Sequence, residues 1–166
     1  MEILVKGISF HASPVDVRER VSLTGDMAIE LLRSLHGEQA FSEALVINTC
    51  NRTEFYIVMD QGEFCFAHLL EHVSQVKGGS PTPEAGAFYE RRGPAAVTHL
   101  FRVAASLDSQ IVGEHEILGQ VKSAYRQALS AGTAQLILNR LMHSAFRVGK
   151  RVQTETALGQ GAASVA

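Results

Sequence analysis

The sequence predicts a mixed α/β (α+β) fold, in which a small antiparallel or mixed sheet with helices is followed by a helical subdomain. Strand-like and helix-like segments alternate over short loops up to about residue 92, which favours this sheet over a parallel, doubly wound one. Every later segment has helical spacing. With 166 residues, 46% of them hydrophobic and 19% charged, the chain can bury one sizeable core.

Strands are expected where Ile, Val and other apolar residues run together between turn residues. Four segments have this character: 2–10, 44–49, 54–59 and a short one at 87–90. The run from Gly78 to Pro83 is the clearest loop in the chain.

Helices are expected where apolar residues recur every three or four positions. Five segments do so: 26–36, 63–77, one from Pro94 to about Ala104, one around 117–128 and one over 134–153. Gly37 ends the first, whose inward face holds Ile29, Leu32 and either Leu35 or His36. We therefore expect one unit over residues 1–156, with an α/β part at about 1–92 and a helical part at about 93–156.

Charge and cysteine content exclude several classes of protein. The net charge of −2 excludes a strongly basic nucleic-acid binder, although not a local basic face. Two cysteines cannot form a disulfide framework, and the N-terminus does not resemble a signal peptide. No apolar run approaches the ~20 residues that cross a bilayer, so a cytoplasmic protein without a membrane span is expected.

Cys50 is the strongest candidate for a reactive residue. It follows an apolar strand and precedes Asn51 and Arg52, so its side chain is expected at an exposed sheet edge. A nearby guanidinium would favour the nucleophilic thiolate, unless Glu54 neutralises Arg52. A small buried core residue is the alternative for Cys50, and it is the expectation for Cys65, inside a predicted helix.

A cysteine nucleophile needs an acid or base within hydrogen-bond reach. Seven histidines are available, and His99 is expected to point inward because it lies beside Leu100 and Phe101 on a predicted helix. A hydrogen-bonded core histidine remains the alternative for each of the seven.

Polar residues also interrupt the apolar pattern between residues 107 and 120. Ser109, Glu114 and Gln120 could form a pocket for a small polar ligand, or Ser109 or Gly113 could simply cap a helix. His115 and Glu116 begin like the zinc motif HExxH, but Gly119 stands where the second histidine belongs, so no metal site is expected.

The last predicted helix carries a basic face. Its residues recur at helical spacing: Arg140, His143, Arg147, Lys150 and the adjacent Arg151. Such a face could lie along a phosphate backbone or could simply be solvated.

Taken together, these segments resemble the N-terminal catalytic domain of glutamyl-tRNA reductase. The matching motifs are Thr49–Glu54, Leu107–Glu114, Ile117–Lys122 and Lys150–Thr156, with His11–Val15 and Arg18-Glu19 near the start. The resemblance spans essentially the whole chain. The family usually has Pro and Gln where this chain has His115 and Glu116.

The resemblance implies NADPH-dependent reduction of glutamyl-tRNA(Glu) to glutamate-1-semialdehyde through a cysteinyl thioester, the first step of five-carbon tetrapyrrole synthesis. Cys50 matches the nucleophile and His99 the histidine that supports activity. The implied substrate-binding positions are Thr49, Asn51, Arg52, Ser109, Glu114, His115, Glu116 and Gln120.

The resemblance also implies a cofactor and partners. NADPH would bind a later domain that this chain lacks, and residues 157–166 would be the linker toward it. Family members are homodimers with glutamate-1-semialdehyde aminomutase as a partner, whereas this segment alone is expected to be monomeric. The alternative functions are a non-catalytic module that binds tRNA or a partner, and an unrelated cysteine hydrolase.

Overall fold

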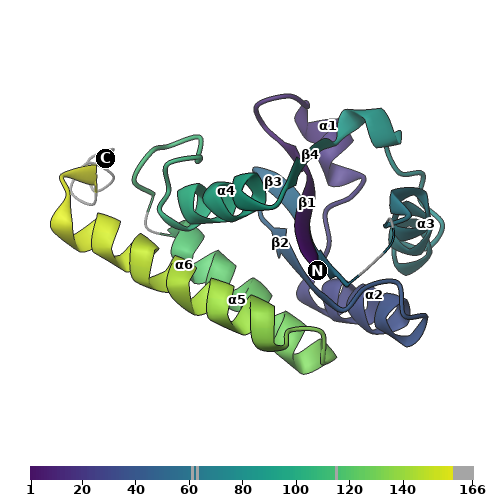
Figure 1. The fold of residues 1–166 in the computed structure, drawn as a ribbon. Helices are drawn as coiled ribbons and strands as arrows, with labels where there is room; N and C mark the ends of the chain where they lie inside the picture. The colour runs from purple at the N-terminus through teal and green to yellow at the C-terminus, as the bar shows by residue number, and fades with distance from the viewer. Residues whose placement is uncertain (61, 63, 115, 159–166) are drawn as a thin grey trace.

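Four strands form one sheet in the computed structural model, which describes residues 1–60, 62, 64–114 and 116–158 (Figure 1). The strands are β1 (Glu2–Ser9), β2 (Glu43–Asn48), β3 (Arg52–Met59) and β4 (Tyr89–Arg92), in the order β2-β3-β1-β4. Each neighbouring pair is antiparallel, which confirms the predicted kind of sheet.

Six α-helices accompany the sheet in the described part of the chain. They are α1 (Val15–Glu19), α2 (Gly25–Gly37), α3 (Phe66–Val76), α4 (Pro94–Ala104), α5 (Glu116–Ala131) and α6 (Leu136–Glu155), with a short 3₁₀ helix at Ala85–Ala87. Five of the α-helices were expected, and the short α1 was not. All described elements after β4 are helical. Residues 159–166 of the expected linker lie outside the described residues.

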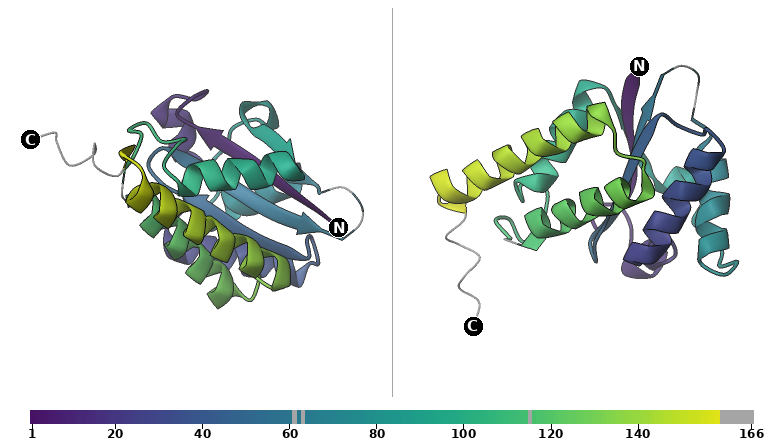
Figure 2. Two further views of the ribbon diagram at one scale, coloured as in Figure 1. Left: turned by 60° about the vertical axis from the view of Figure 1, so that its left-hand side comes forward. Right: turned by 90° about the horizontal axis from the view of Figure 1, so that it is seen from below.

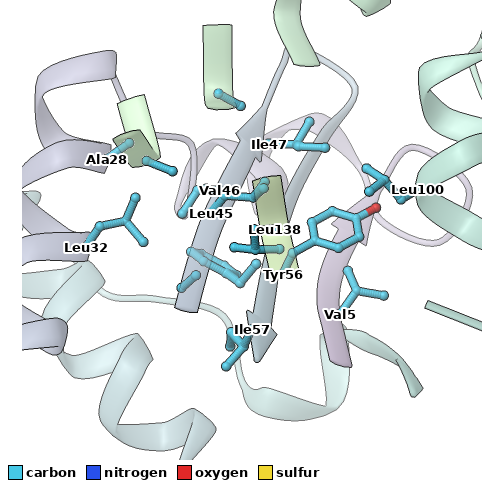
Figure 3. Packing of buried hydrophobic residues seen from close by; sticks show 14 of the residues in the cluster. Val5, Ala28, Leu32, Leu45, Val46, Ile47, Tyr56, Ile57, Leu100 and Leu138 are labelled. Carbon is cyan, nitrogen blue, oxygen red and sulfur yellow. The ribbon is translucent and has the colours of Figure 1, made fainter. Parts of the chain in front are cut away.

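Helices cover both faces of the sheet. In Figure 2, α2 and α3 lie on one side of the strands, and α4 and α6 lie on the other. Successive side chains of a strand point to opposite faces, so Phe55 meets Phe66 of α3 while Tyr56 lies toward Leu100 and Leu138 (Figure 3). Because both faces are covered, β2 and β3 are buried along nearly their whole length.

A buried carboxylate fixes the start of α6 to the sheet. Glu43 on β2 accepts hydrogen bonds from the backbone nitrogens of Gln135, Ile137 and Leu138, at 2.8–3.0 Å. These N–H groups would otherwise lack partners in the first turn of the helix, where a negative charge is favourable. The helical half of the chain is therefore tied directly to β2.

The structure corrects three details of the sequence prediction. Strand β1 ends at Ser9, and helix α3 begins at Phe66, so Cys65 precedes the helix and is exposed instead of buried. On α2, Leu31 is fully buried and Ile29 is only half-buried. The inward face is rotated because α2 packs against α3 and α5 as well as the sheet.

Candidate active site

Cys50 lies at the tip of the tight turn between β2 and β3. The Thr49 backbone nitrogen donates to the Arg52 carbonyl at 2.8 Å, which leaves Cys50 and Asn51 as the two central residues. The Thr49 hydroxyl accepts from the backbone nitrogens of Asn51 and Arg52, at 3.1 and 3.2 Å. The thiol is exposed, as the sequence predicts, on a turn whose conformation is fixed by hydrogen bonds.

Arg18 of α1 holds this turn from outside the sheet. Its guanidinium donates to the Ser13 carbonyl at 2.6 Å and to the Cys50 carbonyl at 3.4 Å. The Phe10 backbone nitrogen also donates to the Asn51 carbonyl at 2.9 Å. The segment that follows β1 therefore fixes the position of the cysteine backbone.

Arg52, the next residue but one, is buried in a charged network. Its side chain is 1% exposed, and Nη1 lies 2.7 Å from Oε1 of Glu54 and 3.5 Å from Oδ2 of Asp108. Nη2 donates to the Asp108 backbone carbonyl. Glu54 therefore does neutralise Arg52, which weakens the argument that Arg52 favours the Cys50 thiolate.

His99 joins the network from helix α4. It is buried, as the sequence predicts, and its Nε2 lies 2.9 Å from Oε1 of Glu54 and 3.3 Å from the Tyr89 hydroxyl. Its Nδ1 lies 3.4 Å from Oδ2 of Asp108. The hydroxyls of Tyr56 and Tyr89 donate to Glu54, at 2.7 and 2.5 Å. Every ring nitrogen and carboxylate oxygen of this cluster thus has a fixed partner.

The network keeps both carboxylates ionised. Burial alone would raise the pKa of Glu54, but hydrogen bonding to His99 and the charge of Arg52 outweigh it and hold the pKa at about 2. The pKa of Asp108 is also lowered: burial opposes ionisation, and the hydrogen bond with His11 and the charge of Arg52 overcome that cost.

A cleft of about 620 Å³ opens beside the network. Its polar lining comes from Ser9, His11, Tyr89, Arg91, Thr98, His99, Arg102 and Asp108. His11 Nε2 lies 2.7 Å from Oδ1 of Asp108. Ser9 and His11 flank Phe10, whose backbone is bonded to the Cys50–Asn51 turn. Cys50 does not itself line the cleft, which is connected to the cysteine turn through this hydrogen-bonded segment. The polar residues of the lining are mainly basic or hydroxyl-bearing.

Comparison with known proteins identifies the family. Residues 6–156 match the family model described as "Glutamyl-tRNAGlu reductase, N-terminal domain". The chain belongs to this family. It is 44% identical over 165 residues to the glutamyl-tRNA reductase of Rubrobacter xylanophilus and 41% identical over 165 residues to that of Geobacter metallireducens. Both matches cover 99% of this chain and 38% of the relative.

A solved structure of the same family has the same fold. The glutamyl-tRNA reductase from Methanopyrus kandleri matches with a TM-score of 0.77 and 30% identity, over 98% of this chain and 37% of that one. This chain thus spans less than two fifths of the glutamyl-tRNA reductases it matches. None of its described helices is long and apolar enough to cross a membrane.

The structure brings together some of the residues that the resemblance to glutamyl-tRNA reductase singles out. Arg52 and His99 share Glu54 and Asp108, and the turn of Thr49, Cys50 and Asn51 adjoins them.

The remaining residues singled out for the pocket are placed differently. Ser109, Glu114 and Gln120 are half-buried and Glu116 is exposed; none of them lines the cleft, and His115 lies outside the described residues. Helix α5 begins at Glu116, so neither Ser109 nor Gly113 is its N-cap.

Sequence reasoning did not select four members of this arrangement: Arg18, Glu54, Tyr89 and Asp108. Glu54 carried a usable signal, because an acid within an apolar strand requires a buried partner. Asp108 and Arg18 lay within matching motifs without an assigned role. Tyr89 joins the site only through long-range packing, which no local pattern indicates.

Proposed function

We propose that this domain transfers the glutamyl group of glutamyl-tRNA to Cys50 as a thioester. In this proposal the transfer opens the NADPH-dependent reduction to glutamate-1-semialdehyde at the start of tetrapyrrole synthesis. One observation carries it: the turn that exposes the Cys50 thiol leads directly into a buried His99–Glu54–Arg52 network, and His99 of this network lines a cleft. Membership of the glutamyl-tRNA reductase family supports glutamyl-tRNA as the substrate.

The chemistry requires one nucleophile and one proton donor. The Cys50 thiolate attacks the ester carbonyl carbon, the new C–S bond replaces the C–O bond, and the terminal ribose oxygen of tRNA leaves with a proton. His99 is the candidate donor because it lines the cleft and Glu54 holds its Nε2, which leaves Nδ1, 3.4 Å from Oδ2 of Asp108, to protonate the leaving oxygen. Glu54 and Asp108 act as positioning residues for that imidazole.

The cleft suits a substrate that carries a carboxylate. Arg91 and Arg102 line it with exposed guanidinium groups, and such groups bind carboxylates in a two-point geometry. We keep Arg52 as a substrate ligand: the long 3.5 Å contact from Asp108 is the one that a glutamyl carboxylate would replace. We also keep the substrate-binding roles that the family implies for Thr49, Asn51, Ser109, Glu114, His115, Glu116 and Gln120 as proposals, and those that the structure describes lie outside the lining of this cleft.

The described residues do not fit an NADPH site of the Rossmann type. Such a site needs a parallel βαβ unit, and the sheet described here is antiparallel throughout. No hydride step is assigned to this chain. We propose that NADPH-dependent reduction uses the part of the longer relatives that lies outside the matched segment.

The proposal is tested by the deacylation of glutamyl-tRNA in the absence of NADPH. Without a hydride donor, water hydrolyses the thioester, so the chain should release free glutamate. Cys50→Ser should abolish the release, and Cys65→Ser, which removes the other exposed thiol, should preserve it. Deacylation that persists in folded Cys50→Ser would refute the thioester.

A non-catalytic tRNA-binding module is the second candidate, favoured by the exposed basic face of α6. Arg140, His143, Arg147 and Lys150 are exposed on one side of this helix, and the adjacent Arg151 is paired with Glu155 at 3.0 Å. Tight tRNA binding without deacylation by either cysteine variant or the parent chain would favour this candidate.

A further inference from the structure

A second cluster of ionisable side chains lies where α2 ends beside α3, on the other side of the sheet from α4 (Figure 2). It consists of Glu38, His68 and His72. We propose that these three residues bind one divalent transition-metal ion of the Zn²⁺ class and that the ion fastens α2 to α3. The thioester proposal does not involve these residues.

The histidine pair has the spacing of a helical metal site. His68 and His72 are four residues apart on α3, so their side chains lie on the same face of the helix. Their ring centroids are 4.6 Å apart, and one potential ligand atom from each of the three residues lies within 4.8 Å of the others. The three potential ligands therefore already lie close together.

The distances suit zinc coordination. Bonds of about 2.0–2.1 Å to nitrogen and oxygen in a tetrahedral site put neighbouring ligand atoms about 3.3 Å apart. His72 Nε2 lies 3.4 Å from Oε1 of Glu38, and His68 Nε2 lies 2.6 Å from Oε2. A small rotation of the exposed His68 ring would open the shorter contact enough to admit an ion.

Glu38 lies at the C-terminal end of α2, where a bound cation would be electrostatically favourable. It is the C-cap of α2, and the chain turns back there through hydrogen bonds from Gln39 and Ala40 to the carbonyls of His36 and Leu35. A carboxylate is unfavourable at the negative end of a helix dipole. A metal ion held between Glu38 and the two histidines would offset that cost.

The remaining ring nitrogens are oriented as metal ligands require. His72 Nδ1 lies 3.1 Å from the Ser34 hydroxyl, and His68 Nδ1 lies 3.6 Å from the Glu71 carboxylate. Histidines that bind metals usually engage the second nitrogen in this way, which fixes the tautomer and the ring plane. Both Nε2 atoms are thereby directed toward Glu38.

The cluster is buried at His72 and open to solvent at His68 and Glu38, where an ion could enter. The His72 side chain is only 8% exposed, whereas those of His68 and Glu38 are 40% and 48% exposed. Two imidazoles and one carboxylate match the N and O preference of Zn²⁺, with a fourth position open to water. Sequence motifs did not indicate this site because its carboxylate comes from another helix, 30 residues before the first histidine.

Equilibrium dialysis against Zn²⁺ at about pH 7.5, where most unperturbed histidines are neutral, tests the proposal. The parent for this experiment is the 166-residue chain with Cys50→Ser and Cys65→Ser, so that thiolates cannot bind the ion. We expect one Zn²⁺ per chain, at least ~10-fold weaker binding in His68→Ala and Glu38→Gln, and no change in His143→Ala. His143 is an exposed histidine on α6 and serves as the matched control.

Thermal unfolding supplies an independent readout. Zn²⁺ should raise the Tm of the parent and of His143→Ala but not that of His68→Ala, because an ion that binds only the folded state stabilises it. If buried His72 proves necessary for folding, the exposed His68 still decides the question. Absence of bound Zn²⁺, or equal binding by His68→Ala and His143→Ala, would overturn the proposal. The cluster would then be a set of hydrogen-bonded ion pairs between Glu38 and the two histidines.

Discussion

Oε1 of Glu54 lies 2.9 Å from Nε2 of His99, and the same oxygen lies 2.7 Å from Nη1 of Arg52. One carboxylate oxygen therefore joins the strand that carries the cysteine turn to the helix that carries the candidate proton donor. Because the Glu54 side chain is fully buried, this junction strongly affects both stability and the geometry of the site.

Glu54→Gln should strongly destabilise the fold. The amide keeps the size of the side chain but leaves the buried Arg52 guanidinium without its closest counter-charge, a change that typically costs about 3–5 kcal/mol. Urea unfolding measures the loss. Glu90→Gln on β4 breaks only partly exposed ion pairs and should cost no more than about 1 kcal/mol. Equal losses in the two variants would contradict the role given to Glu54.

Stability should fall in acid because of the same residue. The pKa of Glu54 is lowered from 4.5 to about 2 in the folded chain, so its contribution is complete above about pH 4.5 and disappears as the pH falls toward 2. The shift corresponds to roughly 3 kcal/mol. Urea midpoints measured from pH 7 down to pH 3 should fall less steeply in Glu54→Gln, and parallel profiles would refute this assignment.

Gly7→Ala should disturb the site through packing alone. A methyl group at Gly7 would lie 2.6 Å from the Tyr89 hydroxyl and 2.9 Å from Cγ of Glu54, so one of them must move. We expect a loss of about 1–3 kcal/mol together with slower deacylation. A methyl group at Gly119 in α5 would have no neighbour within 4 Å among the described residues outside its own helix, so Gly119→Ala should be neutral or stabilising by up to about 1 kcal/mol. A neutral Gly7→Ala would show that the network tolerates displacement.

The basic face of α6 should contribute to tRNA binding through phosphate contacts. Arg140→Gln/Arg147→Gln removes two exposed charges and should reduce the slope of log K against log salt by about 2. Filter-binding titrations at several salt concentrations measure the slope. Arg33→Gln/Arg92→Gln removes the same charge from α2 and β4 and should leave the slope unchanged. The same slope in both double variants would identify the α6 face as merely solvated.

Much of the fold follows from local patterns in the sequence. Apolar spacing predicts helices α2 to α6, and apolar runs rich in β-branched residues predict β1, β2 and β3 to within a few residues. The short β4 was predicted two residues early, at 87–90. Helix α1 was missed because five residues carry too little periodicity. The buried face of α2 differs from the prediction because α2 packs against two other helices, which no local pattern can indicate.

The site is less accessible to sequence reasoning. The exposure of Cys50 and the burial of His99 were predicted from their neighbours and are confirmed by the structure. The pairing of Arg52 with Glu54 was one of two open alternatives, and only the burial of β3 between two layers decides it. Tyr89 reaches the network through the pairing of β4 with β1, which links residues about 80 positions apart.

The most direct test of the account is a single turnover of this chain with tRNA that carries labelled glutamate, without NADPH and with an acid quench. We predict that label is transferred to the protein, that the linkage has the lability of a thioester, and that Cys50→Ser abolishes the transfer while Cys65→Ser does not. Label bound equally to Cys50→Ser, or no transfer and no deacylation by the folded parent chain, would contradict thioester formation by this domain.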